Sequence, residues 1–175
     1  MAEHTAGAGV LPDVLRPGLD LVVCGSAAGA ASARLRAYYA GPGNAFWPVL
    51  CRIGLTPRPL RPEEYALAAE YGIGLTDMVK ERFGADDSLR RGDDRPDLLR
   101  DKIRRYRPRA LAFNGKRAAR AFWGGGAVEY GLQSAREGET AVFVLPSTSG
   151  AARRYWDEKP WIRMARWVRG GTDPF

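Results

Sequence analysis

Leu19-Asp20-Leu21-Val22-Val23-Cys24-Gly25 is a short, mainly apolar stretch that follows Pro17-Gly18 and ends at a glycine. An apolar run of this length between turn-forming residues is typical of a buried β-strand. Two more runs of the same kind occur later in the chain, from Ala110 to Asn114 and from Ala141 to Leu145. The sequence therefore predicts a sheet built around three buried strands.

Helical patterns lie between and after these runs. Their segments are Tyr65 to Tyr71, Pro96 to Tyr106, Lys116 to Trp123 and Trp156 to Val168. The first follows Pro62-Glu63-Glu64, a favourable helix start, and the second carries its apolar residues on one face. Strands that alternate with helices of this length favour an α/β fold with three α/β/α layers, in which the central sheet is open and largely parallel.

The composition suits one globular domain, because 45% of the 175 residues are hydrophobic and 27% are charged. We expect this domain to span residues 10–170, with flexible tails at 1–9 and 171–175 and an exposed, polar loop from Gly84 to Asp94. No apolar run approaches the length of about 18 residues that a membrane span needs, and the first residues lack the pattern of a signal peptide. These features predict a cytoplasmic protein without a membrane partner.

The composition also disfavours metal and histidine chemistry. The only cysteines are Cys24 and Cys51, which lack the spacing and the number of a zinc site or an iron–sulfur cluster. The only histidine is His4, in the predicted N-terminal tail, so a Ser-His-Asp triad has no base. We therefore expect no metal and no cofactor in the functional site.

The net charge is +7 and the isoelectric point is near 9.8, values that suit a polyanionic partner such as DNA. Codon usage offers a second explanation, since 23 of the 27 basic residues are arginine in a chain rich in alanine and glycine. Charge alone leaves both explanations open, because it is a property of composition.

The predicted sheet indicates where a ligand would bind. Open α/β sheets bind ligands beyond the carboxyl ends of their strands. This rule selects three loops: Gly25 to Gly29, Asn114 to Lys116 and Pro146 to Arg154. The first loop has only small residues, which let backbone N–H groups approach a ligand closely, although a tight turn without a ligand explains the same residues.

Several of these segments resemble a known family. From Leu11 to about Arg154, the chain is similar to the mismatch-specific uracil/thymine-DNA glycosylases, a branch of the uracil-DNA glycosylase superfamily. The similar blocks, in chain order, are Leu11-Pro12-Asp13-Val14-Leu15-Arg16-Pro17-Gly18-Leu19, Cys24-Gly25-Ser26-Ala27-Ala28-Gly29, Pro42-Gly43-Asn44-Ala45-Phe46-Trp47, Tyr71-Gly72-Ile73-Gly74-Leu75-Thr76-Asp77-Met78-Val79, Phe113-Asn114-Gly115-Lys116, Tyr130-Gly131-Leu132-Gln133 and Leu145-Pro146-Ser147-Thr148-Ser149-Gly150. They include the loops that the α/β prediction selects.

The resemblance implies a uracil-DNA glycosylase-like fold and a monofunctional hydrolase without a lyase step. Such an enzyme flips uracil out of DNA, including G:U mismatches, and hydrolyses its N-glycosidic bond to start base excision repair. The expected partner is DNA that contains uracil or mismatched bases, and we expect a nucleoid-associated monomer. Bases other than uracil and the choice between single- and double-stranded DNA are left open.

The chain departs from the family at three functional positions. Ala27 replaces the asparagine that positions the attacking water, Ser147 replaces an asparagine of the last loop, and Ala151 replaces the leucine that fills the vacated base stack. These differences leave an alternative open, which is a damaged-DNA-binding module that kept the fold and lost turnover. A nucleotide-binding protein is a more distant alternative, because the spacing around Gly25 to Gly29 matches neither common phosphate-loop motif.

The base-binding pocket is predicted to contain Gly25, Ser26, Ala27, Asn44, Phe46 and Ser147. In this interpretation Phe46 stacks on the flipped base; in the alternative, Phe46 and Trp47 are core residues of a helix that begins near Asn44. Asn44 is then either the N-cap of that helix or a contact in the pocket.

Asp77 is the main catalytic candidate, in place of Ala27. A carboxylate can orient water and stabilise the oxocarbenium-like transition state of glycosidic cleavage. The alternative is that Asp77 caps a helical turn from Met78 to Arg82. Ser26 is a weaker catalytic candidate, as is Ser147, because a hydroxyl carries no charge and no histidine is available to activate it.

The last loop is predicted to hold DNA, together with the start of the helix after the second strand. The candidate DNA-binding residues are Ser147, Ser149, Gly150, Ala151, Arg153, Arg154 and Lys116. Their hydroxyls and cations suit phosphate contacts, although a solvated surface turn has the same composition. Because Ala151 is small, Arg153 or Tyr155 is a candidate to fill the gap in the base stack. We interpret the arginines from Arg100 to Arg109 as a solvated helix face.

Overall fold

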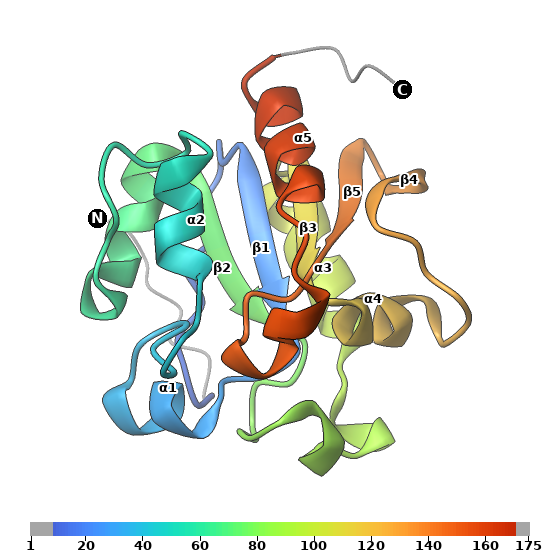
Figure 1. The fold of residues 1–175 in the computed structure, drawn as a ribbon. Helices are drawn as coiled ribbons and strands as arrows, with labels where there is room; N and C mark the ends of the chain where they lie inside the picture. Colours follow the sequence, from blue (N-terminus) through green and yellow to red (C-terminus); the bar gives the residue numbers. More distant parts are fainter. Residues whose placement is uncertain (1–8, 171–175) are drawn as a thin grey trace.

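The computed structural model describes residues 9–170 of the chain, so the predicted tails lie, apart from Gly9, outside the described residues. The strands are β1 (Leu21–Gly25), β2 (Ile73–Asp77), β3 (Ala110–Asn114), β4 (Gly131–Glu137) and β5 (Thr140–Leu145). The α-helices are α1 (Ala30–Leu35), α2 (Phe46–Arg52), α3 (Pro96–Tyr106), α4 (Lys116–Trp123) and α5 (Lys159–Val168). Short 3₁₀ helices are η1 (Pro62–Tyr71), η2 (Asp86–Ser88), η3 (Arg91–Asp93) and η4 (Gly150–Tyr155) (Figure 1).

The central sheet has five strands in the order β2-β1-β3-β5-β4. β1 pairs in parallel with β2 and β3, and β3 pairs in parallel with β5, while β4 is an antiparallel edge strand. The three predicted strands correspond to β1, β3 and β5, and all are buried. The sequence did not predict the other two, because Gly74 interrupts β2 and its last residues are polar, while β4 is polar and largely exposed.

Helices cover both faces of the sheet. On one face, a core cluster joins Val23 and Phe143 of the sheet to buried residues of α2 and α5. On the other face, a second cluster joins Val22 and Val144 to buried residues of α3 and α4. Successive residues of a strand point to opposite faces, so β1, β3 and β5 each contribute to both clusters. This arrangement confirms the predicted three-layer α/β/α fold.

The carboxyl ends of β1, β2, β3 and β5 meet at one edge of the sheet, because these strands are parallel. This carboxyl edge is at the bottom of Figure 1, where α1, η4 and the segment with η2 and η3 gather. The loops at Gly25 to Gly29, Asn114 to Lys116 and Pro146 to Arg154 therefore come together, and the chain after β2 joins them.

Two of the four predicted helices have the expected bounds, those of α3 and α4. The other two predictions need correction. The segment Tyr65 to Tyr71 is the end of the 3₁₀ helix η1, which begins at Pro62. Trp156 lies outside α5, because α5 begins at Lys159. The side chain of Asp157, two residues before this helix, accepts a hydrogen bond from the Lys159 N–H. Within residues 9–170, no helix is both long enough and apolar enough to cross a membrane.

Arg104, Arg105, Arg107 and Arg109 are exposed, as the predicted solvated face requires, whereas Arg100 is partly buried. Arg100 and Arg104 both form ion pairs with Glu137 on β4, at 3.5 and 3.2 Å. Arg100 also packs its guanidinium group 3.9 Å from the centre of the Phe122 ring. These contacts fasten α3 to its neighbours, because β4 is the edge strand and α4 lies beside α3.

Candidate active site

Asp77 and Gly25 lie side by side at the carboxyl edge. They are register partners at the last positions of β2 and β1. A Cβ atom on Gly25 would lie 2.7 Å from Oδ1 of Asp77 and 3.2 Å from the hydroxyl oxygen of Tyr39. A distance of 2.7 Å is a clash, so only glycine lets this carboxylate lie against the end of β1. The predicted residues Asp77 and Gly25 are therefore brought together, and Tyr39 joins them.

Asp77 is a buried carboxyl group with only 6% of its surface exposed. Burial raises the pKa of Asp77 from 3.8 to about 6, because a charged carboxylate loses hydration in this position. Lys80 and Lys102 lower the pKa of Asp77 and Asp13 raises it, but burial has the largest effect. A carboxyl group with a pKa near neutrality is common among catalytic acids and bases.

Asp77 does not cap a helix, which corrects the alternative reading of this residue. The N–H groups of Met78 and Val79 donate to the carbonyl oxygens of Gly25 and Ser26, both at 2.8 Å. The chain after β2 therefore continues its pairing with β1 instead of turning into a helix from Met78 to Arg82.

Tyr39 covers the ring of Phe46. Their ring centres are 3.9 Å apart and the rings are tilted by 31°, while Trp47 and Trp161 pack on Phe46 edge-on. Phe46 has no exposed surface, whereas Tyr39 is only partly buried. A base cannot stack on Phe46 in this arrangement, which corrects the prediction for that residue. Tyr39 has a backbone φ of +55°, and this uncommon left-handed conformation turns its ring onto Phe46.

The hydroxyl group of Tyr39 is an available hydrogen-bonding group at the centre of the site. It is buried and has no well-formed hydrogen bond among the described residues. Burial and the neighbouring Asp77 raise the pKa of Tyr39 well above its usual value, and the nearby Asn114 has a smaller, opposite effect. Buried polar groups are almost always paired, so a neutral, unpaired hydroxyl beside a carboxyl group is suited to a ligand.

Asn114 connects the end of β3 to the loop after β5. Its side-chain amide donates to Oγ1 of Thr148 at 2.9 Å, and its Oδ1 accepts from the backbone N–H of Thr148 at 3.0 Å. Both residues are buried. The sequence did not single out Tyr39 or Thr148 as site residues, while Asn114 lay both in a selected loop and in one of the blocks that resemble the family.

The loop that precedes α2 packs against the loop after β5. The N–H of Ala45 donates to the carbonyl oxygen of Thr148 at 2.9 Å. A Cβ on Gly150 would lie 2.9 Å from the carbonyl oxygen of Pro42, so a glycine is needed at this approach. Oδ1 of Asn44 accepts from the N–H of Phe46 at 3.0 Å, but the N-cap residue of α2 is Ala45, so Asn44 precedes the cap that it was predicted to form.

The other pocket candidates lie in the turns after β1 and β5. Ser26 and Ala27 are partly buried in the turn after β1, and the Ser26 carbonyl oxygen is bound by Val79. Ser147 lies near Gly115, because a Cβ atom added to Gly115 would be 3.4 Å from the Cβ atom of Ser147. The Ser147 hydroxyl accepts from the N–H of Ser149, with a distance of 3.3 Å. The two serines therefore lie in loops at the carboxyl edge, next to Gly25 and Gly115.

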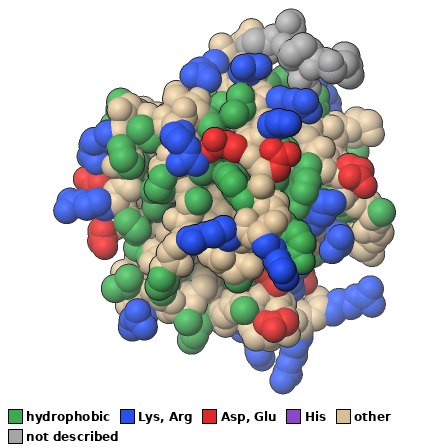
Figure 2. Space-filling view, in the orientation of Figure 1, with side chains coloured by type: hydrophobic (Ala, Val, Ile, Leu, Met, Phe, Trp, Pro, Cys, Tyr) green, Lys and Arg blue, Asp and Glu red, His purple; other side chains and the backbone are tan. Residues whose placement is uncertain are grey.

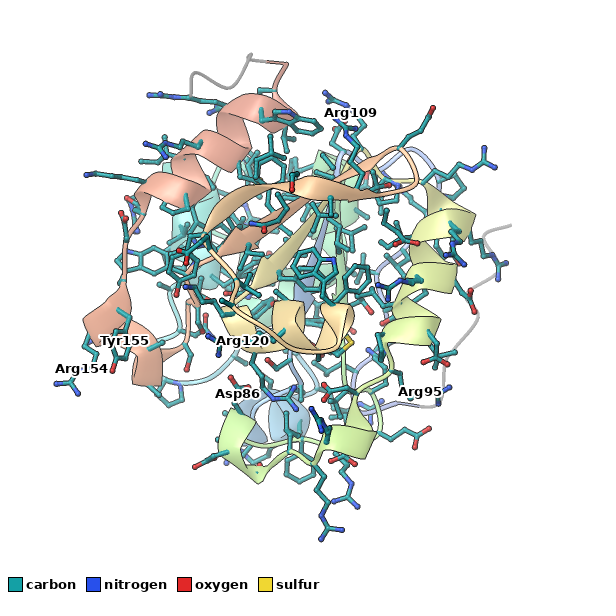
Figure 3. The ribbon with its side chains drawn as sticks, turned by 90° about the vertical axis from the view of Figure 1, so that its right-hand side faces the viewer. Asp86, Arg95, Arg109, Arg120, Arg154 and Tyr155 are labelled. Carbon is teal, nitrogen blue, oxygen red and sulfur yellow. The ribbon has the colours of Figure 1, made fainter. Side chains whose placement is uncertain are left out.

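The predicted DNA-binding residues lie on and near η4. The Ser149 hydroxyl caps this helix by accepting from the Ala151 N–H at 3.3 Å, and Ala151, Arg153 and Arg154 are exposed. Figure 3 shows Arg154 on η4, pointing away from the sheet. Figure 2 shows lysine and arginine side chains spread over the face of the molecule that carries η4.

Two of the basic candidates already have partners. Nζ of Lys116 lies 4.4 Å from the centre of the Tyr130 ring, a cation–π contact. A guanidinium nitrogen of Arg153 would lie 2.9 Å from a Cβ on Gly43, so its side chain rests on the loop before α2. Arg154 stacks only on the neighbouring Tyr155, at 5.9 Å, and Tyr155 is 70% exposed. Arg154 is therefore the freest cation of η4.

No group of three or more histidine, cysteine, aspartate or glutamate side chains in residues 9–170 is arranged to hold a metal ion. Cys24 is buried in the core and Cys51 is partly buried. His4 lies outside the described residues. The chemistry that the site itself offers is that of a buried carboxyl group, an unpaired phenol and backbone amides.

The chain is similar to proteins of one family over almost its whole length. Residues 12–168 match the family model of the uracil DNA glycosylase superfamily. Among solved structures, the chain resembles the solution NMR structure of a protein from Methanosarcina acetivorans whose assignment as a uracil DNA glycosylase is itself provisional. The two are 25% identical and superpose with a TM-score of 0.61, over 91% of this chain and 96% of the other.

Proposed function

We propose that this chain, which belongs to the uracil DNA glycosylase superfamily, is a monofunctional glycosylase that hydrolyses the N-glycosidic bond of uracil in DNA. We include uracil in G:U mismatches, as in the mismatch-specific branch, and a role at the start of base excision repair. The observation that carries the proposal is the buried Asp77 carboxyl group against Gly25, at the carboxyl edge of a sheet with this family's fold.

The proposed reaction is a hydrolysis. The deoxyuridine nucleotide first leaves the base stack, which costs roughly a few kcal/mol, and enters the site at the carboxyl edge. A water molecule then forms a bond to C1′ of the sugar as the bond to N1 of uracil breaks, and the electron pair leaves with the base. Ionised Asp77 orients this water, accepts its proton and stabilises the positive charge that develops on the sugar. The product is an abasic site, since no lysine in the site is available for a lyase step.

Tyr39 takes the place of Phe46 as the aromatic face for the base in this proposal. We expect Tyr39→Ala to lower single-turnover cleavage roughly 5- to 150-fold, because base–aromatic stacking is worth ~1 to 3 kcal/mol. Tyr39→Phe keeps the ring and therefore the stacking, so it should cleave faster than Tyr39→Ala. Phe46→Ala is the control: it should lower the melting temperature, since removal of a buried phenylalanine costs about 3 to 5 kcal/mol. Unchanged cleavage by a folded Tyr39→Ala protein would exclude Tyr39 from the pocket.

DNA is proposed to lie across η4, with backbone contacts from Ser149 and Gly150. We expect Arg154→Ala to reduce the slope of log K against log salt by about 0.9, the value for one phosphate contact in duplex DNA. Arg153→Ala should have a smaller effect, since Arg153 also rests on Gly43. Arg105→Ala on α3 removes an exposed cation from the far side of the sheet and should leave the slope unchanged. Equal slopes for wild type and Arg154→Ala would remove η4 from the DNA interface.

One assay tests the function directly. A duplex oligonucleotide with a single uracil opposite guanine is incubated with the protein and then treated with alkali, which cleaves at abasic sites. Strand cleavage is the expected result, and the same duplex with cytosine in place of uracil should stay intact. Repeating the assay with thymine, other deaminated bases and single-stranded DNA defines the substrate range.

A damaged-DNA-binding module is the second candidate, and the observation that favours it is Ala27. This residue leaves the turn after β1 without the polar side chain of the family pattern. A binding module would retard the uracil duplex in a gel without producing alkali-sensitive sites. For either function, we propose that the protein acts on cytoplasmic, nucleoid DNA as a monomer.

A further inference from the structure

A cluster of charged side chains lies behind Asp77. Thr76 precedes Asp77 on β2, so its side chain points to the opposite face of the sheet. Oδ1 of Asp13 accepts from the Thr76 hydroxyl at 2.8 Å and forms an ion pair with Lys80, also at 2.8 Å. Oδ2 of Asp13 forms an ion pair with Lys102 of α3 at 2.6 Å, and Lys102 lies 3.4 Å from the Thr76 hydroxyl.

This charged cluster, made of Asp13, Lys80 and Lys102, joins three separate parts of the chain. The exposed fractions of the three side chains are 22%, 15% and 24%, so each is largely removed from solvent. Lys80 also donates to the carbonyl oxygen of Leu11 at 2.7 Å and lies 3.2 Å from the Tyr38 hydroxyl.

The charged cluster carries more positive than negative charge. One carboxylate is shared by two ammonium groups, and neither lysine is paired with another carboxylate in the described part of the chain. Lysines are seldom buried without an equal number of partners, since each desolvated charge is costly. The surplus positive charge is therefore unusual. The cluster contacts the hydroxyl group of Thr76, and the next residue on β2 is the buried Asp77.

We propose that Lys80 and Lys102 are positioning residues that, held by Asp13, place a surplus positive charge behind Asp77 and keep its carboxylate ionised in the closed pocket. The inference rests on the proposed role of Asp77 in hydrolysis. A buried carboxylate needs such compensation most when a base fills the site and excludes the remaining water, because charges interact more strongly at low dielectric.

The groups around Asp77 have effects of known direction. Lys80 and Lys102 lower the pKa of Asp77, whereas Asp13 raises it. Tyr39, Tyr38 and Cys24 also face Asp77 or the charged cluster, but burial raises the pKa of each well above its usual value, so all three stay neutral near pH 6. Asp77 is therefore the group that titrates near pH 6, and substitutions in the charged cluster should move its titration in opposite directions.

The experiment measures single-turnover cleavage of the uracil duplex between pH 5 and pH 8.5. Lys102→Met should move the acid limb of the profile to higher pH, so that activity at pH 6, relative to pH 8.5, falls at least about threefold against wild type. Asp13→Asn should move the limb to lower pH. Lys102→Arg keeps the positive charge and should restore the wild-type profile. A purely structural role for the charged cluster predicts lower activity at every pH and no opposite movement.

Arg117→Met is the matched control. Arg117 forms a two-point ion pair with Asp94, at 2.9 and 3.1 Å, and their exposed fractions of 22% and 11% are close to those of the charged cluster. Loss of this ion pair should lower the melting temperature without moving the acid limb.

A direct titration separates this inference from the proposed function. The carboxyl carbon of Asp77, identified by its loss in Asp77→Asn, is followed by NMR against pH in wild type, Lys102→Met and Asp13→Asn. Opposite shifts of its midpoint support the inference even if the protein cleaves no uracil. Identical midpoints in the three folded proteins would overturn it. If Lys102→Met does not fold, Lys80→Met gives the same test, since Lys80 has the same expected direction.

Discussion

Asp77→Ala is expected to lower single-turnover cleavage of uracil-containing DNA by about 100-fold or more, with DNA affinity nearly unchanged. The reason is that the carboxylate would interact with the water and with the positive sugar mainly in the transition state. Asp77 is only 6% exposed, so it contributes little to the surface that binds DNA. Rapid-quench cleavage and a binding titration on the same duplex check both parts of the prediction.

Two further variants sharpen this test. Asp77→Asn should be milder than Asp77→Ala, because an amide can still hold a water molecule. Ala27→Asn should partly restore cleavage to Asp77→Ala if both positions border the same water, since Ala27 lies in the turn that directly follows Gly25. Wild-type cleavage by Asp77→Ala would contradict the catalytic role and direct attention to Ser26, Ser147 or the backbone amides.

Asp77→Asn is expected to raise the stability of the protein at neutral pH. The pKa of Asp77 is raised from 3.8 to about 6 in the folded state. A raised carboxyl pKa means that the folded state binds the proton more tightly than the unfolded state, so stability falls as pH rises from about 4 to above 6. The ionised carboxylate lowers the free energy of unfolding by roughly 3 kcal/mol at pH 7.5, and asparagine avoids this loss. The melting temperature should rise by about 6 to 12 °C, which calorimetry measures.

The pH dependence identifies the cause of this stabilisation. At pH 4 the two proteins should melt at nearly the same temperature, because Asp77 is then protonated in the folded protein. Asp97→Asn is the control, since Asp97 is exposed and its pKa is lowered by Arg95, so it should not produce the rise. A lower melting temperature for Asp77→Asn at pH 7.5 would mean that the carboxylate stabilises the fold. The proposed function instead requires the protein to tolerate a buried charge for the reaction.

The pair of Phe46 and Tyr39 illustrates a limit of sequence-based prediction. The Asn44-Ala45-Phe46-Trp47 segment indicated an aromatic residue beside the first loop, and an aromatic pair is indeed present there. Which ring faces the site depends on the left-handed backbone of Tyr39 and on the packing of Trp161 from α5 against Phe46. Phe46 and Trp161 are more than 100 positions apart, and no local pattern contains their contact.

The sequence by itself determined the three-layer fold and the edge where the site lies. Short apolar runs produce β1, β3 and β5, periodic apolar residues produce α3 and α4, and the parallel pairing that follows brings the selected loops to one edge. Such information is local, because burial of a strand or of one helix face requires only the right spacing of apolar residues.

Only the tertiary structure decided the chemistry of Asp77. The sequence did not predict its strand, because Gly74 interrupts the apolar run and the last residues are polar. β2 forms because it pairs with β1 on one side and with Val14 on the other. The pairing places Asp77 against Gly25, away from water, and in front of the charged cluster that the N-terminal segment and α3 complete. Burial and distant charges set the pKa of a carboxyl group, and both are properties of the assembled fold, not of the residue or its neighbours in sequence.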